Sequence, residues 1–128
     1  MPTPKDNRKE NLKDCLSRDQ EIKITVIGRK SGHKISIPVW FVFENSSEAA
    51  KLYLLPVQGS DTQWYKNILH NPSIQIDARG AEAELQAAPT TNEKTIKSVM
   101  EKFREKYGAG DFRKYYSKFD VAVLVEVA

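Results

Sequence analysis

The feature that most constrains the fold is the order of short strand-like segments along the chain. Apolar residues alternate with polar ones, or run together briefly, in six segments: residues 21–28, 33–44, 51–57, 73–78, 81–88 and 120–127. Apolar residues recur at helical spacing in residues 58–72 and 90–108, and residues 110–118 form a turn or a short helix. Three of the five connections, residues 29–32, 45–50 and 79–80, are too short for the crossovers that parallel strands require. The sequence therefore predicts a mainly β fold with flanking helices, in which six antiparallel strands form a small barrel.

Pro38 predicts where the second of these strands lies in the sheet. Proline has no backbone N–H to donate to a neighbouring strand, so it is confined to sheet edges and bulges. We therefore expect the residues around Pro38 at an edge, at a bulge or at the rim of a cavity.

Length and composition bound the class of protein. The 128 residues fit one domain, which we place at residues 19–128, after a polar arm or short helix at residues 1–18. The single cysteine, Cys15, excludes an intramolecular disulfide. The net charge of +3 is too small to indicate a nucleic-acid partner. The longest apolar run has seven residues, which is short of a membrane span, so we expect a cytoplasmic protein without a stable membrane anchor.

The loop between the first two predicted strands is rich in glycine and in positive charge. Its sequence, GRKSGHK, holds three cations and His33 and no acid. Glycines allow successive backbone N–H groups to converge on an anion, and Arg29, Lys30 and Ser31 add side-chain donors. The spacing is not that of a nucleotide-triphosphatase phosphate loop, and a strand follows it. The residues alone leave two interpretations open: a solvated hairpin tip, or a site that binds an anion.

Two further segments are candidate parts of a site. The turn before the first helix, PVQGSD, leads into Trp64 and Tyr65, which either anchor the helix in the core or shape a pocket. Ser60 with Gln63 fits a capping box at the start of that helix, and Asp61 is an alternative cap. The aromatic residues near the C-terminus form either core or a lid over a pocket, where a tyrosine can donate a proton. These candidates are Tyr107, Tyr115 and Tyr116.

Residue patterns for other chemistries are absent from the sequence. Two distant histidines and one cysteine make no zinc-binding pattern, and no G-x-S-x-G elbow occurs. An enzyme with this sequence would take its chemistry from a cofactor.

Two quoted stretches carry a resemblance to a known family. ITVIGRKSGHKISIPVWFV, followed by LYLLPVQGSDTQWYKNILHNPSIQIDARG, resembles the deazaflavin-dependent nitroreductases. These belong to the split β-barrel flavin-binding superfamily, with the pyridoxamine phosphate oxidases. The resemblance covers residues 20–128 and implies a six-stranded split barrel that binds coenzyme F-420, an 8-hydroxy-5-deazaflavin with a phosphate and a polyglutamate tail. The chain departs from the family where Ser60, Asp61 and Thr62 follow Gly59, since well-known members carry a basic residue there.

The resemblance also assigns roles to residues of this chain. It implies that Arg29, Lys30 and Ser31 bind the phosphate and carboxylates of the tail, supported by Gly28, Gly32 and Lys34. It implies that two segments border the deazaflavin ring, with Trp64 and Tyr65 shaping the pocket. Their residues are Ser36, Pro38 and Trp40 in one segment, and Pro56, Val57, Gln58, Gly59 and Ser60 in the other. The C-terminal tyrosines are candidate catalytic residues.

The implied activity is hydride transfer from reduced F-420 to an electrophilic small molecule such as an enone, a quinone or a nitro compound. Two alternatives stay open: an FMN-binding oxidoreductase of the same fold, and a module that binds a cofactor, haem or a lipid without turnover. Split barrels often dimerise across a sheet face, so a homodimer is a further expectation. Nucleic acid is the least expected partner.

Overall fold

The structure is a computed structural model that describes residues 12–45 and 50–127. Most of the predicted N-terminal arm, residues 1–11, and the polar turn at residues 46–49 lie outside the described residues. Residues 12–18 are helical, and the side chains of Leu12 and Leu16 are buried.

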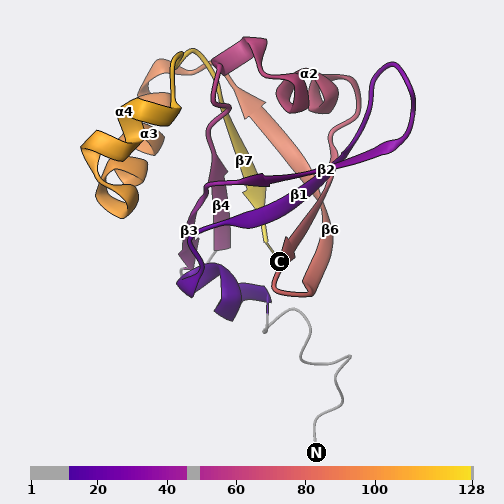
Figure 1. Cartoon of the computed structure of the whole chain (residues 1–128), viewed down its shortest axis with the longest axis horizontal. Helices are drawn as coiled ribbons and strands as arrows, with labels where there is room; N and C mark the ends of the chain where they lie inside the picture. The colour runs from indigo at the N-terminus through magenta and orange to yellow at the C-terminus, as the bar shows by residue number, and fades with distance from the viewer. Residues whose placement is uncertain (1–11, 46–49, 128) are drawn as a thin grey trace, which may run out of the picture.

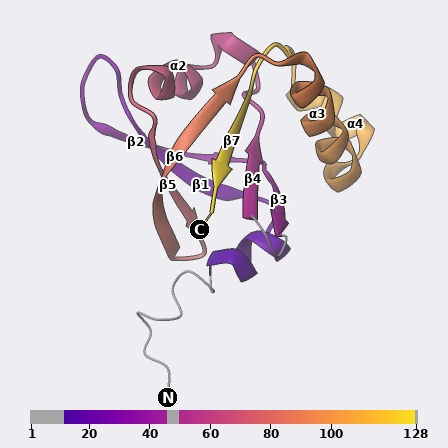
Figure 2. The same ribbon diagram turned by 180° about the vertical axis from the view of Figure 1, so that it is seen from behind.

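Seven antiparallel strands form one sheet in the order β2-β1-β5-β6-β7-β4-β3. Figures 1 and 2 show that the sheet curls into a half-barrel, which confirms the predicted mainly β fold. The two edge strands are consecutive in the chain, so the curling brings both edges of the sheet to one short link. The strands are β1 (Ile22–Ile27), β2 (Lys34–Val39), β3 (Val42–Asn45), β4 (Ala50–Leu54), β5 (Ser73–Ala78), β6 (Ala81–Thr90) and β7 (Ala122–Glu126).

The strand count differs from the predicted six because the second predicted strand divides at Trp40 and Phe41. Its first half, β2, pairs with β1, whereas its second half, β3, pairs with β4. Alternation of apolar residues runs through the division, so the local pattern gave no sign of it. Pro38 lies in the edge strand β2 opposite Lys23, as predicted from its missing N–H group.

Three further helices flank the sheet: α2 (Gln63–His70), α3 (Glu93–Tyr107) and α4 (Ala109–Tyr115). In Figures 1 and 2, α2 lies over one end of the barrel near the β1–β2 loop, and α3 and α4 pack together at one side. The predicted capping box of Ser60 and Gln63 is wrong. Thr62 is the N-cap of α2, and Ser60 lies in the preceding 3-10 turn η1 (Gly59–Asp61), where its hydroxyl bonds elsewhere.

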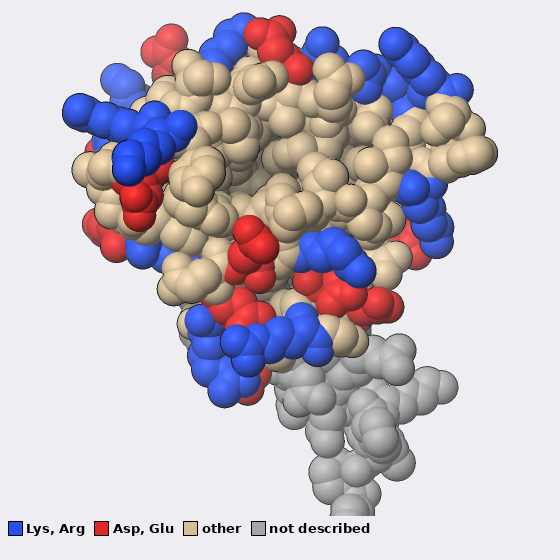
Figure 3. Space-filling view, in the orientation of Figure 1, with Lys and Arg blue, Asp and Glu red and all other residues tan. Residues whose placement is uncertain are grey.

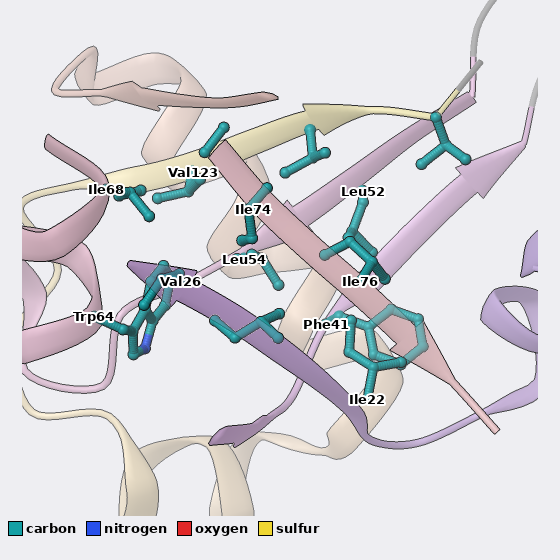
Figure 4. Packing of buried hydrophobic residues seen from close by; sticks show 14 of the residues in the cluster. Ile22, Val26, Phe41, Leu52, Leu54, Trp64, Ile68, Ile74, Ile76 and Val123 are labelled. Atoms are coloured by element: carbon teal, nitrogen blue, oxygen red, sulfur yellow. The ribbon is translucent and has the colours of Figure 1, made fainter. Parts of the chain in front are cut away.

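The hydrophobic core has two parts. The larger fills the barrel, where inward-facing residues of the strands meet Trp64 and Ile68 of α2 (Figure 4). The smaller lies under α3 and α4 and includes Phe103, Phe112 and Tyr116. Both parts of the core pack against the strands of the sheet. This packing holds the ends of β2, β4 and α4 at fixed positions around the candidate site.

Candidate active site

A cleft of about 410 Å³ lies beside the C-terminal half of β2. Its walls come from β2, the β4–α2 connection, the start of α2 and the end of α4. It brings together six of the residues singled out from the sequence: Pro38, Trp40, Val57, Trp64, Tyr115 and Tyr116. Figure 3 shows a hollowed, uncharged surface between α2 and the α3–α4 pair, with charged side chains around it. The volume is in the range of small-molecule sites.

Trp40 forms an aromatic wall of the cleft. One face of its ring stacks on Tyr107, with centroids 4.2 Å apart and planes 6° apart. Tyr115 meets it edge-on at 4.7 Å, and Tyr116 lies tilted at 6.1 Å. Aromatic contacts of this kind restrict a large side chain to one orientation. The indole is therefore held in place before any ligand binds.

Tyr107 supports this wall from behind and does not line the cleft. Its hydroxyl accepts a hydrogen bond from the backbone N–H of Phe41 at 3.0 Å. It lies 2.8 Å from the carbonyl oxygen of Phe41 and 2.7 Å from that of Gln20, to which it donates. Burial raises the pKa of Tyr107 to about 12, so the hydroxyl keeps its proton. The Tyr107 hydroxyl is therefore engaged by backbone groups of Gln20 and Phe41. Phe41 lies in the short segment between β2 and β3 and belongs to neither strand.

Lys106 also contacts Phe41, in the segment between β2 and β3. Its Nζ donates to the carbonyl oxygen of Phe41 at 2.9 Å and lies 3.6 Å from the centroid of the Phe41 ring. Burial lowers the pKa of Lys106 to about 8. The end of α3 thus satisfies backbone groups that no neighbouring strand reaches.

The two other candidate tyrosines lie on the cleft wall. Tyr115 is 58% exposed, whereas Tyr116 is 5% exposed. Burial raises the pKa of Tyr116 well above its usual value. The Tyr116 hydroxyl makes no hydrogen bond with another described residue, so it can donate one to a ligand.

The glycine-rich loop is bound to α2 through Arg29. The guanidinium donates to Asn67 Oδ1 at 2.7 Å and to Gln63 Oε1 at 2.8 Å, and the Arg29 backbone N–H donates to Asn67 Oδ1 at 3.1 Å. The side chain of Asn67 is buried. Arg29 is thus a bridge between the loop and α2, and its guanidinium donors are already bonded to two neutral amide oxygens.

The remaining loop groups are exposed side chains. The backbone N–H groups of Gly28, Gly32 and His33 donate within the loop. They are therefore not free to form the anion nest that the glycines suggested. Lys30 and Lys34 are exposed and form no ion pair within the part of the chain that the structure describes. Lys30 and Lys34 therefore carry positive charge that is open to a ligand.

Contacts with the segment after α4 hold the β4–α2 connection in place beside the cleft. We call the contact between Ser60 and Asp120 the latch. The N–H and hydroxyl of Ser60 both donate to the Asp120 carboxylate. The N–H of Ser117 donates to the carbonyl oxygen of Val57 at 2.9 Å. Lys118 Nζ lies 3.1 Å from Asp61, so a lysine from a distant segment lies beside the turn where the family resemblance led us to expect a basic residue.

The other predicted site residues lie outside the cleft. Ser36 bonds Thr25 on the outer face of the sheet, Tyr65 is buried in the core, and Gln58 is exposed. Pro56, Gly59 and Ser60 shape the connection without lining the cavity. Sequence reasoning did not single out five lining residues: Glu21, Ile37, Val39, Leu55 and Thr62. The hairpin register is a signal that could have pointed to Glu21. Ile22 pairs with Val39, so a register continued by one residue would bring Glu21 toward Trp40.

The sequence model of one protein family, described as "Uncharacterized protein conserved in bacteria (DUF2255)", matches residues 13–122. The chain belongs to the DUF2255 family. The match spans strands β1 to β6 of the DUF2255 sheet and reaches only the first residue of β7. No curated protein matches the chain.

Solved structures show which fold this DUF2255 protein has. It is similar to an F-420-H2 dependent reductase, with 21% identity, a TM-score of 0.63, and coverage of 84% of this chain and 94% of that one. It is also similar to a candidate pyridoxamine 5'-phosphate oxidase from Listeria innocua (13%, TM-score 0.64, coverage 93% and 91%). HutZ, a heme storage protein from Vibrio cholerae, is a third (12%, TM-score 0.60, coverage 92% and 87%). At such identities the likeness establishes the split-barrel fold.

No helix among the described residues is long and apolar enough to cross a membrane.

Proposed function

We propose that this DUF2255 protein binds coenzyme F-420 and reduces an electrophilic small molecule such as an enone, a quinone or a nitro compound. The observation that carries the proposal is the placement of the aromatic cleft and the free lysines along one strand. Pro38 and Trp40 line the cleft, whereas Lys34 begins β2 and Lys30 lies in the loop before it. The residues from Lys34 to Trp40 extend over about 20 Å at the rise of a strand. A planar ring in the cleft with a long anionic tail could reach these lysines.

The residues of the cleft fit the ring part of such a cofactor. Trp40 is held by its stack on Tyr107, and Trp64 is fixed by burial in the barrel core. Both offer rigid aromatic surface to a planar group. The exposed Lys30, Ser31 and Lys34 are the side chains that would hold the phosphate and carboxylates of the tail. Arg29 would keep that loop in position through Asn67 and Gln63.

The chemistry is shared between cofactor and chain. Bound reduced F-420 would supply a hydride from its ring carbon. The chain would position the substrate, exclude water with its aromatic walls, and hold a proton at the Tyr116 hydroxyl. We assign this last role to Tyr116 because it lines the cleft, whereas the Tyr107 hydroxyl is bonded to backbone groups.

The alternative cofactors give different experimental signs. A protein that carries FMN is yellow as purified and absorbs at about 450 nm. Haem proteins commonly ligate the iron through histidine, cysteine, methionine or tyrosine. Among the described residues that line the cleft, none is histidine, cysteine or methionine. Tyr115 and Tyr116 are the described lining residues that could ligate haem iron, and the absorption spectrum of the purified protein distinguishes haem from a flavin relative.

Titration with oxidised F-420, followed by deazaflavin fluorescence, tests the proposal. We expect saturable binding in the micromolar range, about tenfold weaker when Lys30 and Lys34 are both replaced by alanine. A matched double variant, Lys94→Ala with Lys97→Ala, removes the same charge from the exposed face of α3 and should bind like the wild type. Equal losses in the two double variants would refute the assignment of the tail to the loop. The expected homodimer stays a prediction, which light scattering checks.

A further inference from the structure

The cleft carries a negative charge in its lining, and the exposed lysines of the glycine-rich loop lie outside it, about 20 Å away along β2. Among the described residues that line the cavity, Glu21 carries the only charge. It precedes β1 and lines the cleft together with Trp40, whereas Lys34 begins β2 at its other end and Lys30 lies in the loop before it. A carboxylate at an apolar cavity attracts cations and repels anions.

Glu21 also lines a neighbouring cavity with Lys23 and Arg79, and these cations, like Lys106 at the end of α3, are engaged with other groups. Lys23 Nζ lies 3.6 Å from the carboxylate of Asp77, and Lys106 Nζ is bonded to the carbonyl oxygen of Phe41. Arg79, across the neighbouring cavity, lies 2.8 Å from Asp19. Glu21 itself forms no ion pair with a described residue. Its charge is therefore open to a ligand in the cleft.

The walls beside this carboxylate are aromatic. Trp40, Tyr115 and Tyr116 form one aromatic group, and Trp64 lines the same cavity. Tyr115 stands edge-on to Trp40 and is more than half exposed, so its ring is open to the cavity and to solvent. The faces of such rings carry negative potential and bind organic cations, most strongly where water is excluded.

We propose that the Glu21 end of the cleft binds an organic cation, an ammonium or quaternary amine carried on an aromatic or other planar group. Its assignment as the substrate position rests on the proposed function, whereas cation binding itself does not. The anionic part of a ligand then lies toward Lys30 and Lys34, and the cationic part lies against Glu21 and the aromatic walls. The site thus discriminates between substrates by charge at the Glu21 end.

Three small probes of similar size test the inference on the protein without cofactor. They are phenyltrimethylammonium, the uncharged 2-phenylpropan-2-ol, and benzoate. Saturation-transfer NMR with each probe measures binding, and titration gives affinity. We expect the cation to bind about tenfold tighter than the uncharged probe, and benzoate to bind most weakly. Equal binding of cation and uncharged probe, or tighter binding of benzoate, would overturn the proposal.

Replacing the carboxylate isolates its contribution. Glu21→Gln should weaken binding of the cation about fivefold and leave the uncharged probe unchanged. Glu82→Gln removes an exposed acid of β6 outside the cleft and should have no effect. Loss of cation binding in both variants alike, or in neither, would refute the role of Glu21. Cation binding without F-420 binding would reject the proposed function alone, and F-420 binding without charge selection would reject only this inference.

Discussion

Ser60 donates two hydrogen bonds to Asp120, one from its backbone N–H at 2.9 Å and one from its hydroxyl, although the two residues are 60 positions apart. This contact joins the β4–α2 connection to the segment that follows Tyr115 and Tyr116. Because Val57 on one side and Tyr116 on the other both line the cleft, the contact sets the distance between two of its walls.

The latch requires glycine at position 59. Its φ is +55°, and a Cβ there would lie 2.2 Å from Asp120 Oδ1 and 2.9 Å from Lys118 Cγ. We expect Gly59→Ala to lower the free energy of unfolding by about 3 kcal/mol. Gly80→Ala is the matched control, because Gly80 also has positive φ but nothing within 4 Å, so it should cost about 1 kcal/mol. Urea denaturation measures both, and equal losses would contradict the steric part of the argument.

The latch should also weaken in acid. Hydrogen bonds from Ser60, the largest cause, hold the pKa of Asp120 below its ordinary value. A carboxyl with a lower pKa in the folded state stabilises the protein above its unfolded pKa, and this contribution is lost as the pH falls through the folded pKa. The stability difference between the wild type and Asp120→Asn should therefore be constant near neutral pH and shrink below about pH 4. Glu126→Gln, an exposed change on β7, should show a smaller pH dependence. A difference that grew in acid would contradict the account.

Lys106 should make the stability of the protein depend on pH in the alkaline range. Its pKa is about 8 in the folded protein, below the ordinary value of 10.5, because of burial. Between these values the unfolded chain binds more protons, so stability rises with pH. Compared with Lys106→Met, the wild type should become relatively more stable from pH 8 to pH 10. Lys97→Met, at an exposed position of the same helix, should show no such trend. Thermal unfolding across this range checks both variants.

Tyr107 and Tyr116 should separate into one structural and one functional residue. Tyr107→Phe removes the hydroxyl that bonds Phe41 and Gln20 and should lower the free energy of unfolding by about 1–3 kcal/mol. Tyr116→Phe should leave stability nearly unchanged and slow the reduction of a substrate about tenfold or more. Unfolding curves together with steady-state rates distinguish the two. Unchanged stability with a lost rate in Tyr107→Phe would reverse the assignment.

The elements of the fold could be predicted because they depend on local patterns. Alternating apolar residues located the strands, and apolar residues at helical spacing located α2 and α3. The division at Trp40 and Phe41 could not be predicted, because it results from closing the barrel. Its backbone groups are satisfied by Tyr107 and Lys106, more than sixty positions away.

The site could be predicted in part for the same reason. Pro38 and Trp64 were marked by residue type and by their position in the chain, whereas Trp40 was named through the family resemblance, and all three line the cleft. The partners of Arg29 lie 34 and 38 positions away on α2, so a loop sequence alone could not show that its guanidinium is already bonded. Ser60 and Asp120 meet for reasons of topology that no local pattern contains.

The central claim is that the cleft and the lysine loop bind the two ends of one deazaflavin cofactor. The most direct measurement compares the affinity of the wild-type protein for F-420 and for the same deazaflavin without its phosphate and glutamate tail, at low and high salt. The account predicts micromolar binding of F-420, at least about tenfold weaker binding of the tail-less molecule, and a salt dependence confined to F-420. Equal, salt-independent affinities would contradict the role of the loop, and no binding of either molecule would contradict the claim as a whole.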